Sequence, residues 1–512
     1  MQQKENPVFL GVELGSTRIK AVAIDKGFSP VSSGDYTWAS SYENGVWTYD
    51  LDEVWTGLKA AVSGIENREN VCAMGISAMM HGYLAFDSEW NLLVPFRTWQ
   101  NTITGRAAQE LTELFGFNIP QRWSIAHLYQ AVLNEEPHVS KLAHITTLAG
   151  YVHHALTGRS CVGIGEASGM FPIDSVNGCY DREMLKKFND LIAGRGLPWR
   201  LEELLPEVLP AGANAGVLTA EGAERLGGLL SAGIPLAPAE GDAGTGMTAT
   251  NAVAPRTGNV SAGTSVFAMV VLEKMLSRVY PEIDMVTTPT GRPVAMVHCN
   301  NCTSDMNAWV GMFGEAFREM GFEADTGELF TRLYQKSLEG DADCGGITVC
   351  NYQAGEPVTG FDEGRPLVVR DPAKPLGLAN FIRAQLYSTM ATLAAGMELL
   401  QREHVAIDRM MGHGGLFKTP VVGQRYMAAA TNAPVWVMKT AGEGGPYGMA
   451  LLAAFLTEGN GLSLEKYLEQ RVFASASGTA LEPEAEDVAG FRAYLNRFLS
   501  GLNVERAAIE HL

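Results

Sequence analysis

The chain contains one short pattern twice: an apolar run, a turn made of glycine and hydroxyl residues, and a second apolar run. The first turn is Gly15-Ser16-Thr17, between apolar runs at 8–14 and 19–24. The second is Gly263-Thr264-Ser265, followed by a strongly apolar run at 266–272. Each copy predicts a β-hairpin, because small polar residues favour tight turns and short apolar runs favour strands. The repeat therefore predicts two domains of similar core that face one cleft.

The two predicted turns have the chemistry of an anion site. Their small residues leave backbone N–H groups and hydroxyls free to surround a phosphate. Lys20 follows the first turn closely enough to add positive charge. Each hairpin could thus supply donors to one side of a polyphosphate. Taken alone, the first turn is better explained as a plain hairpin with polar turn residues.

A single aspartate stands between the two hairpins in the stretch Gly241-Asp242, with small residues after it and no Lys or Arg beside it. Glycine next to an acid lets the backbone turn tightly and approach a ligand closely. One hypothesis is a carboxylate that acts as a general base at a cleft. The alternative is an aspartate that caps a helix beginning near Gly244.

Residues suited to a sugar occur between the first hairpin and this aspartate. Met80 and His81 follow a buried-looking strand predicted at 72–77, and Trp99 and Arg106 lie just before a helix predicted at 107–115. Indole and guanidinium groups suit a ligand with an apolar face and many hydroxyls. The alternative is a core tryptophan, a solvated arginine and a histidine in a turn.

Two glycine-rich turns near the end of the chain each precede a predicted helix. Such turns would let the backbone lie flat against an adenine ring and its ribose, and helix N-termini favour phosphate oxygens. Neither turn is a Walker A sequence or a G-x-G-x-x-G sequence, so P-loop and Rossmann chemistry are disfavoured. The candidate residues are Gly412, Gly414 and Gly415 in the first turn, and Gly444 and Gly445 in the second.

Composition excludes several classes of function. The formal net charge of −19 argues against a nucleic-acid partner. No apolar run reaches 18 residues, so no membrane span is expected. The seven cysteines are scattered, and the N-terminus lacks a secretory signal pattern, so a cytoplasmic protein is expected.

Taken in order, these motifs resemble the FGGY family of carbohydrate kinases, within the actin-like ATPase superfamily. The resemblance covers nearly the whole chain. It implies an α/β fold of two actin-like (ribonuclease H-like) domains, each a mixed sheet flanked by helices, with a cleft between them. We expect the N-terminal domain to span residues 1–238, with the sugar and phosphate side. The C-terminal domain would span 239–512, with the catalytic aspartate at its start and the adenosine side.

The resemblance also implies a reaction. Met80-His81-Gly82 looks most like xylulokinases, which predicts transfer of the γ-phosphoryl group of ATP to the terminal hydroxyl of a ketopentose such as xylulose. L-ribulose or another sugar or polyol is the alternative substrate. The expected cofactors are ATP and Mg²⁺, and the expected partners are the sugar and ATP, with neither nucleic acid nor membrane. The oligomeric state is left open, a homodimer included.

The resemblance gives each motif a role. Asp242 would accept the hydroxyl proton, and Glu13 and Asp242 would hold the metal. The sugar would contact Met80, His81, Trp99, Arg106 and Asp242. ATP and its phosphates would contact Gly15, Ser16, Thr17, Lys20, Gly263, Thr264, Ser265, Gly412, Gly414, Gly415, Gly444 and Gly445.

The chain departs from the family pattern at several positions. Glu13 stands where the family has Asp, Met79 where it has Gln, and Ala243 where it often has Asn. The stretch 124–132 carries His127 and Gln130 in place of Lys and Trp. These departures bear on the sugar more than on the reaction type. Two further hypotheses stay open: an ATP-driven actin-like switch without a sugar, and a sugar-binding regulator without turnover.

Overall fold

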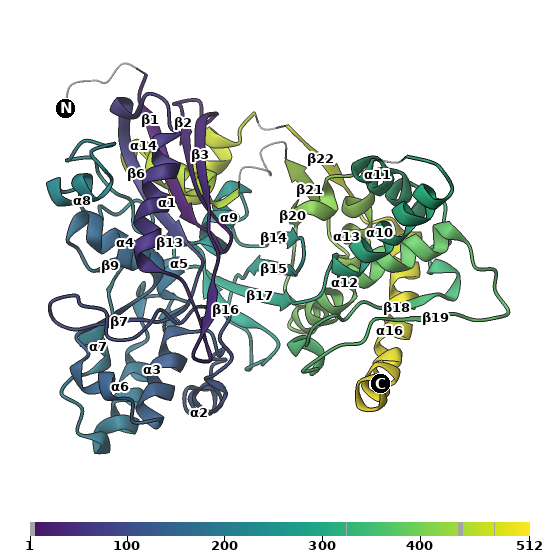
Figure 1. Ribbon diagram of the computed structural model, residues 1–512, viewed down its shortest axis with the longest axis horizontal. Coiled ribbons are helices and arrows are strands. Elements are labelled where there is room, and N and C mark those ends of the chain that lie inside the picture. The colour runs from purple at the N-terminus through teal and green to yellow at the C-terminus, as the bar shows by residue number, and fades with distance from the viewer. Residues whose placement is uncertain (1–5, 324, 439–443, 476) are drawn as a thin grey trace. The chain divides into compact units, whose positions relative to one another are not determined.

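The computed structural model describes residues 6–323, 325–438, 444–475 and 477–512, which form two compact units (Figure 1). The first unit contains Met1–Ala254, Met285–Val294 and Glu443–Ser475. The second contains Pro255–Asp284, Ala295–Gly442 and Ala476–Leu512. The first unit extends past residue 238, where the sequence predicts a boundary, because the short strand β13 pairs with a strand of the first unit.

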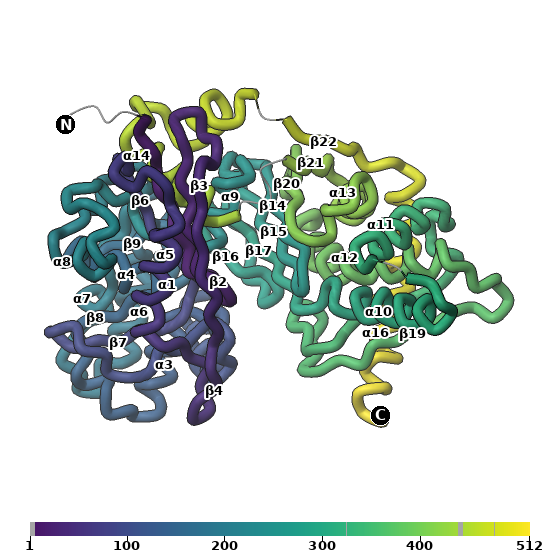
Figure 2. Tube along the Cα trace, turned by 45° about the horizontal axis from the view of Figure 1, so that its top comes forward, coloured from purple at the N-terminus to yellow at the C-terminus, as the bar shows by residue number. Residues whose placement is uncertain are grey.

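The first unit is built on a five-stranded mixed sheet in the order β13-β6-β1-β2-β3. β2 pairs antiparallel with both β1 and β3, whereas β6 runs parallel to β1 and β13 runs parallel to β6. The purple strands β2 and β3 run side by side in Figures 1 and 2. The predicted strands at 8–14, 19–24 and 72–77 are confirmed. The sheet consists of β1 (Val8–Leu14), β2 (Arg18–Ile24), β3 (Pro30–Thr37), β6 (Val71–Ala78) and β13 (Glu240–Gly241).

Two helices cover opposite faces of this sheet, because side chains alternate along a strand. Leu10 and Val12 belong to the apolar core that includes Leu58 of α1. Gly11, between them, faces α14 so closely that a Cβ there would lie 2.0 Å from the carbonyl oxygen of Pro446. The odd-numbered face of β1 is therefore the α14 face. The two helices are α1 (Leu51–Ser63) and α14 (Gly444–Glu458).

The remaining elements of the first unit surround this sheet and form a helical layer of their own. The predicted helix at 107–115 is confirmed as α2, and the apolar run at 84–86 forms the strand β7. The helices are α2 (Gly105–Phe115), α3 (Ser124–Leu133), α4 (Leu148–Thr157), α5 (Ile164–Ala167), α6 (Arg182–Ile192), α7 (Leu201–Leu204), α8 (Ala220–Arg225), α9 (Asp242–Ala249) and α15 (Leu464–Tyr467). The short strands are β4 (Ser41–Glu43), β5 (Val46–Thr48), β7 (Leu84–Phe86), β8 (His144–Thr146), β9 (Cys161–Gly163), β10 (Ile173–Asp174), β11 (Cys179–Tyr180) and β12 (Glu207–Leu209).

The second unit is built on a sheet in the order β16-β17-β15-β14-β20-β21-β22. β14 pairs antiparallel with β15 and parallel with β20, and β20 runs parallel to β21. The unit boundaries at 284 and 294 fall inside β16 and β17. The strands are β14 (Thr257–Ala262), β15 (Val266–Val271), β16 (Asp284–Thr287), β17 (Pro293–Cys299), β20 (Arg409–His413), β21 (Val435–Met438) and β22 (Gly478–Leu481), with β18 (Thr348–Cys350) paired to β19 (Leu367–Val369) apart from the sheet.

The long helix α12 lies at the centre of the second unit and is buried along most of its length. The spacing of apolar residues over 377–404 predicts an amphipathic helix, and α12 confirms it. Arg383 of α12 forms a buried ion pair with Asp487 of α16 at 2.5 Å, which fixes these two helices against each other. The helices of this unit are α10 (Ser304–Glu319), α11 (Thr326–Ser337), α12 (Leu378–Arg402), α13 (Val422–Thr431) and α16 (Ala485–His511).

The cores of the two units have the same strand order. The first reads β3-β2-β1-β6-β13, and the second contains the run β17-β15-β14-β20-β21. In both, a central strand pairs antiparallel with its hairpin partner on one side and parallel with a later strand on the other. The predicted duplication is thus confirmed at the level of topology.

Candidate active site

The candidate site of the first unit lies where β1, β6 and β13 end together. Parallel pairing aligns Glu13 with Ser77, and Glu240 with the same serine. Gly241 aligns with Ala78, so Asp242 follows directly at the same sheet edge. Parallel strands present their carboxyl ends at one edge, and this edge brings together residues more than 200 positions apart in sequence.

Asp242 begins helix α9, and Gly241 is the N-cap residue. The alternative, in which Asp242 caps a helix starting near Gly244, is therefore wrong, because the helix starts two residues earlier. The carboxylate oxygen Oδ1 of Asp242 instead accepts from the backbone N–H of Met80 at 3.2 Å and of Ala243 at 2.9 Å. The first of these bonds ties the aspartate to the turn that follows β6.

Solvent reaches the Asp242 side chain, yet the protein packed around it removes part of its hydration. This burial raises the pKa of Asp242 above its ordinary value, while the N–H donors of Met80 and Ala243 and the charge of Arg122 partly oppose the shift. A carboxylate with a raised pKa is a stronger base than an ordinary surface aspartate. The geometry is thus compatible with proton abstraction.

Glu13 projects from the α14 face of β1 towards the same edge. The pKa of Glu13 is raised to about 8, first by burial and then by the charge of Asp242, while Lys20 and hydrogen bonds from Thr245 and Ser77 oppose the rise. Those two hydroxyls lie 3.2 Å apart. The buried oxygen Oε2 of Glu13 has no hydrogen-bond partner. It is an oxygen donor ready for a cation.

Lys20 stands directly opposite Glu13 in the β1–β2 hairpin. The two side chains share a face of the sheet, which explains the electrostatic effect of Lys20 on Glu13. At the hairpin tip, the carbonyl of Gly15 accepts from the indole Nε1 of Trp38 at 2.7 Å, and the carbonyl of Ser16 accepts from the hydroxyl of Tyr49 at 2.7 Å. These two bonds hold the tip in place and leave the side chain of Thr17 exposed.

The turn after β6 holds Met80 and His81 in buried positions. His81 has a backbone φ of +74° and Gly82 one of +87°. A positive φ is strained for a residue with a side chain, so the surrounding structure fixes this conformation. The ring nitrogen Nδ1 of His81 lies 3.2 Å from the carbonyl oxygen of Gly169, and the ring stacks on Trp123 with centroids 6.3 Å apart.

Trp99 and Arg106 lie in more exposed positions than the other predicted sugar contacts. Trp99 is 37% exposed. Arg106 is in the first turn of α2, where its Nε donates to the carboxylate of Glu110 at 2.8 Å. The guanidinium of Arg106 is thus engaged by Glu110 in this structure. Sugar binding by Trp99 and Arg106 stays a prediction.

The departures in α3 lie within packed structure. Burial lowers the pKa of His127 to about 3, with Arg97 contributing, and both of its ring nitrogens lack a hydrogen-bond partner. Its ring stacks on Tyr83 with centroids 6.2 Å apart. Gln130 accepts from the backbone N–H of Ala107 through Oε1 at 3.3 Å and thereby joins α3 to α2. Both side chains serve packing within the helical layer.

In the second unit, the hairpin Gly263-Thr264-Ser265 and the loop after β20 lie side by side. Ser261 of β14 pairs with His413 of β20, and a Cβ on Gly414 would lie 2.4 Å from the carbonyl oxygen of Ala262. Gly414 has φ +102°, and a Cβ on Gly412 would lie 2.7 Å from the ring of Phe417. These glycines are thus also required for packing. Around Gly263 and Gly415 there is open space.

The two glycine-rich turns that the sequence groups together belong to different units. Gly412, Gly414 and Gly415 lie in the second unit, whereas Gly444 and Gly445 lie in the first. A Cβ on Gly445 would lie 1.5 Å from the carboxylate oxygen Oε2 of Glu13. The start of α14 therefore packs directly on Glu13. Glu443, which the predicted turn also includes, lies outside the described residues.

Several residues of this edge carry no sequence signal that would have identified them. Ser77 and Thr245 reach Glu13 only because β6 pairs with β1 and α9 starts beside them. Trp123 is fully buried with its indole Nε1 lacking a hydrogen-bond partner, a donor left over beside His81. Glu166 and Glu240 are also fully buried, and burial raises the pKa of Glu240 to about 8 and that of Glu166 well above its usual range.

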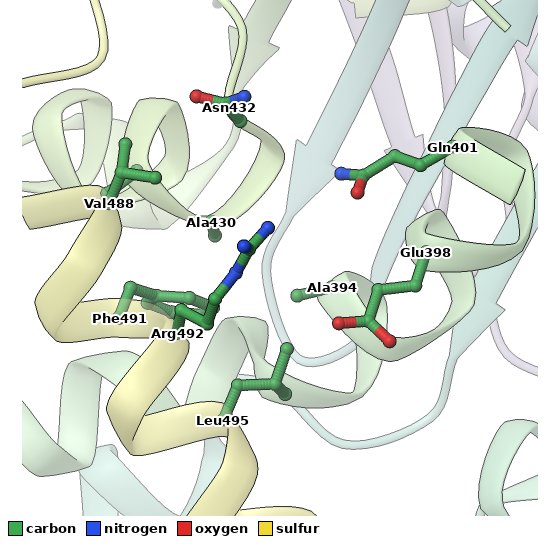
Figure 3. Close-up of a pocket in the computed structure, with 10 residues that line it drawn as sticks. Ala394, Glu398, Gln401, Ala430, Asn432, Val488, Phe491, Arg492 and Leu495 are labelled. Carbon is green, nitrogen blue, oxygen red and sulfur yellow. The ribbon is translucent and has the colours of Figure 1, made fainter. Parts of the chain in front are cut away.

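A small cavity in the second unit is separate from all of these residues. It lies between α12, α13 and α16, with Glu398, Gln401 and Arg492 among its lining side chains (Figure 3). Its volume is about 30 Å³. A ligand pocket needs hundreds of cubic ångströms, so this cavity is no sugar site.

The described residues provide neither a ready-made metal cluster nor a membrane-spanning helix. They contain no group of three or more His, Cys, Asp and Glu side chains arranged to hold a metal ion. Among the helices formed by 6–323, 325–438, 444–475 and 477–512, none has the length and apolarity needed to cross a membrane.

Comparison with known proteins matches both halves of the chain to one family. Residues 8–248 match the N-terminal domain of the FGGY family of carbohydrate kinases, and residues 258–457 match its C-terminal domain. A xylulose kinase of Haemophilus influenzae is 21% identical over 429 residues, which cover 80% of this chain and 83% of that protein.

Solved structures share the whole fold. The xylulose kinase of Lactobacillus acidophilus superposes with a TM-score of 0.79 at 16% identity, covering 97% of this chain and 98% of that chain. The gluconate kinase of the same organism gives a TM-score of 0.78 at 16% identity, covering 98% of each chain. The fold is thus the two-domain, actin-like and ribonuclease H-like fold of sugar kinases, with mixed sheets flanked by helices. The chain belongs to the FGGY family of carbohydrate kinases.

Proposed function

We propose that the protein transfers the γ-phosphoryl group of ATP to the terminal hydroxyl of a ketopentose. Xylulose is the first candidate, and L-ribulose or another sugar or polyol is the alternative. ATP is the donor that family membership implies. The observation that carries the proposal is the hydrogen bond from the Met80 N–H to Asp242, because it joins the candidate base to the Met80-His81 turn.

Asp242 is the proposed proton acceptor. Both of its hydrogen bonds from Met80 and Ala243 go to Oδ1, so Oδ2 would accept the proton of the substrate hydroxyl. Phosphoryl transfer depends on in-line placement and charge neutralisation more than on covalent chemistry. A base that the protein fixes at one oxygen and desolvates meets these needs, since its position is set before the substrate arrives.

The sugar would lie against the turn that follows β6. Met80 offers an apolar surface, and His81 and the unpartnered indole N–H of Trp123 offer polar groups beside it. Such a mixture of few polar groups on an apolar wall is typical of small-ligand sites. Trp99 and Arg106 would contribute from the more exposed side.

Mg²⁺ fits the residues present. Glu13 and Asp242 provide carboxylate oxygens, and Ser77 and Thr245 provide hydroxyls next to Glu13. Mg²⁺ prefers oxygen ligands and is usually held by one or two carboxylates with waters and substrate phosphates. When bound, the ion would neutralise charge on the phosphates. Glu13, whose Oε2 has no partner of its own, would hold the ion or its water shell.

The glycine and hydroxyl turns are proposed to bind ATP. Gly15, Ser16, Thr17 and Lys20 would contact phosphates from the first unit, with Gly444 and Gly445 beside them. Gly263, Thr264 and Ser265 would contact phosphates from the second unit, and the open space at Gly415 would accommodate the nucleoside with Gly412 and Gly414 shaping the loop. A cytoplasmic location is proposed as well, supported by cysteines that are free of disulfide bonds.

A coupled ADP-release assay tests the proposal. D-xylulose, L-ribulose, pentitols, glycerol, hexuloses and gluconate would each be offered with ATP and Mg²⁺, beside a reaction without sugar. We expect release that depends on one ketopentose. Release that ignores every sugar would favour the ATP-driven switch, and sugar binding by calorimetry without ADP release would favour the regulator.

A further inference from the structure

Glu240 lies in β13, two residues before Asp242, and glycines surround its side chain. The side chain is 1% exposed. A Cβ on Gly163 would lie 2.1 Å from its Oε1, and a Cβ on Gly165 would lie 2.4 Å from its Oε2. Gly244 approaches the same oxygen, at 3.2 Å from its Cβ position. The three glycines come from two segments. Because they lack side chains, they leave room for the Glu240 carboxyl group, and a larger residue at any of the three positions would approach that group too closely.

The Glu240 carboxyl group joins β13, the strand directly before Asp242, to the segment around α5. Its Oε2 accepts from the backbone N–H of Glu166 at 3.0 Å, and the N–H of Gly165 also donates to this carboxyl group. The N–H of Gly163 donates to the carbonyl of Ala239 at 2.7 Å, which adds a backbone bond between the same two segments. Glu240 thus holds α5 against β13, directly before Asp242.

The α5 segment in turn contacts the predicted sugar-binding turn. A Cβ on Gly241 would lie 2.4 Å from Oε2 of Glu166 and 2.9 Å from Cγ of Met80, so this carboxyl group and Met80 meet at one point of the β13 backbone. Three residues further on, the carbonyl of Gly169 contacts His81 at 3.2 Å. One continuous segment therefore runs from the Glu240 clamp to Met80 and His81.

We propose that Glu240 is a positioning residue, which holds Asp242 and the Met80-His81 turn in their mutual geometry by clamping the α5 segment to β13. The residue touches neither sugar nor phosphate in this account. It acts through the backbone of β13, which leads into Asp242, and through the α5 segment, which contacts Met80 and His81. The proposal rests on the proposed function for its kinetic consequences but not for its structural ones.

Three substitutions of Glu240 test the clamp by its reach. Glu240→Gln keeps the length and an acceptor oxygen for the N–H groups of Gly165 and Glu166, so kcat should stay within about threefold of wild type. Glu240→Asp is one methylene shorter and Glu240→Ala has no acceptor. We expect Glu240→Ala to lower kcat by about 10²-fold and to raise the KM for the sugar, since a misplacement of about 1 Å has effects of that order. Glu240→Asp should lie between Gln and Ala.

Glu356 provides a matched control in the second unit. It is also fully buried, its Oε2 accepts from the backbone N–H of Asn301 at 3.2 Å, and its Oε1 lacks a hydrogen-bond partner. The same three substitutions there should lower the melting temperature as the Glu240 substitutions do, while kcat and the sugar KM change by less than about twofold. A merely structural role of Glu240 would make the two series alike, and that result would overturn the proposal.

A crystal structure of Glu240→Asp supplies a readout that does not depend on turnover. We expect the Asp242 carboxylate and the Met80-His81 turn to shift relative to each other. Unchanged positions of these groups would overturn the positioning role of Glu240, whether or not the wild type phosphorylates a sugar. A wild type that phosphorylates no sugar would contradict the proposed function alone. If Glu240→Ala fails to fold, the order of Gln and Asp still decides: equal kcat values for Glu240→Asp and wild type would also overturn the positioning role.

Discussion

The two units carry the same strand order but place different chemistry at the ends of their strands. In the first unit, Glu13 of β1 pairs in register with Ser77, and the neighbouring strand delivers Asp242. In the second unit, the position equivalent to Glu13 is Ser261, and it pairs with His413. Burial lowers the pKa of His413 to about 4, so this ring is neutral at physiological pH.

This difference teaches that the duplicated scaffold and the chemistry are separable. Both copies keep a hairpin with a glycine and two hydroxyl residues, which suits a phosphate on either side. The carboxyl groups suited to a proton and a metal ion stand on the first copy. On the second copy, the loop at Gly414 and Gly415 replaces them with backbone and open space. Substitutions in the two copies should therefore affect different steps.

The largest effect is expected from Asp242→Asn in the first unit. Removing a general base lowers kcat by roughly 10²–10⁴-fold. The melting temperature and ATP binding should hardly change, because the side chain is exposed and the amide oxygen still accepts from Met80. Steady-state ADP release beside a melting curve checks this. Near-wild-type turnover would remove Asp242 from the mechanism.

Glu13→Gln should come second. It keeps the shape of the side chain and removes the negative charge that Glu13 would carry with Mg²⁺ bound, so the Mg²⁺ concentration needed for half-maximal rate should rise about 10–100-fold and kcat should fall. Glu13→Asp should be milder, and Ser261→Ala at the equivalent position of the second unit should leave the Mg²⁺ requirement unchanged. A magnesium titration of the variants decides. A loss of thermal stability without a change in that requirement would make Glu13 a structural residue.

Gly445→Ala tests the same carboxylate without altering it. The added methyl group would lie 1.5 Å from the present position of Oε2 of Glu13, so the carboxylate must move. We expect a Mg²⁺ requirement raised by about tenfold. Gly246→Ala is the control, because a Cβ there meets nothing within 4 Å. Equal Mg²⁺ titrations for the two variants would show that the position of Glu13 does not govern metal use.

Unlike the carboxylates, the two hairpins should contribute equally to ATP binding. Thr17→Val and Thr264→Val each remove one exposed hydroxyl. A hydrogen bond to a charged phosphate contributes roughly 1.5 kcal/mol or more, so each variant should raise the KM for ATP by about tenfold with little change in the sugar KM. If only one of the two variants affects ATP, the hairpins do not share the phosphates.

The smallest effect concerns pH. A buried glutamate with a raised pKa stabilises the fold below about pH 4.5, and this contribution is lost as pH rises through its folded pKa. The relevant values are about 8 for Glu240 and about 7 for Glu356. The melting temperature of Glu240→Gln starts below that of wild type, and the gap should narrow by a few degrees as pH rises from about 4.5 to about 8. The gap for Glu356→Gln should stop narrowing near pH 7. If the melting temperatures of the two variants, relative to wild type, changed with pH in the same way over the whole range, the pKa values given to Glu240 and Glu356 would be contradicted.

Local patterns were sufficient for much of the fold. Apolar runs and turn residues predicted β1, β2 and β6 closely, and the amphipathic repeat predicted α12, because these features depend on neighbours in sequence. The boundary at 238 differs from the compact units because β13 adds to a sheet whose other strands lie in the first 78 residues. Pairing of strands so far apart leaves no local trace.

The candidate site was predicted where chemistry and motif coincide, as at Glu13, Met80 and Asp242. Glu166, Glu240 and Trp123 were missed, since their importance arises only when β6, β13 and the α5 segment meet. α9 starts two residues before the helix start that a capping aspartate predicts, because a helix that opens directly with Asp242 after Gly241 looks like a capped helix in sequence. Arg106 was assigned to the sugar, and its ion pair with Glu110 became visible only in the structure.

Phosphorus NMR of the reaction mixture tests the central claim most directly. ATP, Mg²⁺ and D-xylulose would be incubated with wild type and with Asp242→Asn, and L-ribulose would be offered in parallel. The account predicts that wild type converts the γ-phosphate signal into a phosphomonoester signal split by the protons of a terminal CH₂ group, and that Asp242→Asn does so far more slowly. A γ-phosphate that appears only as inorganic phosphate, at the same rate with and without sugar, would contradict it.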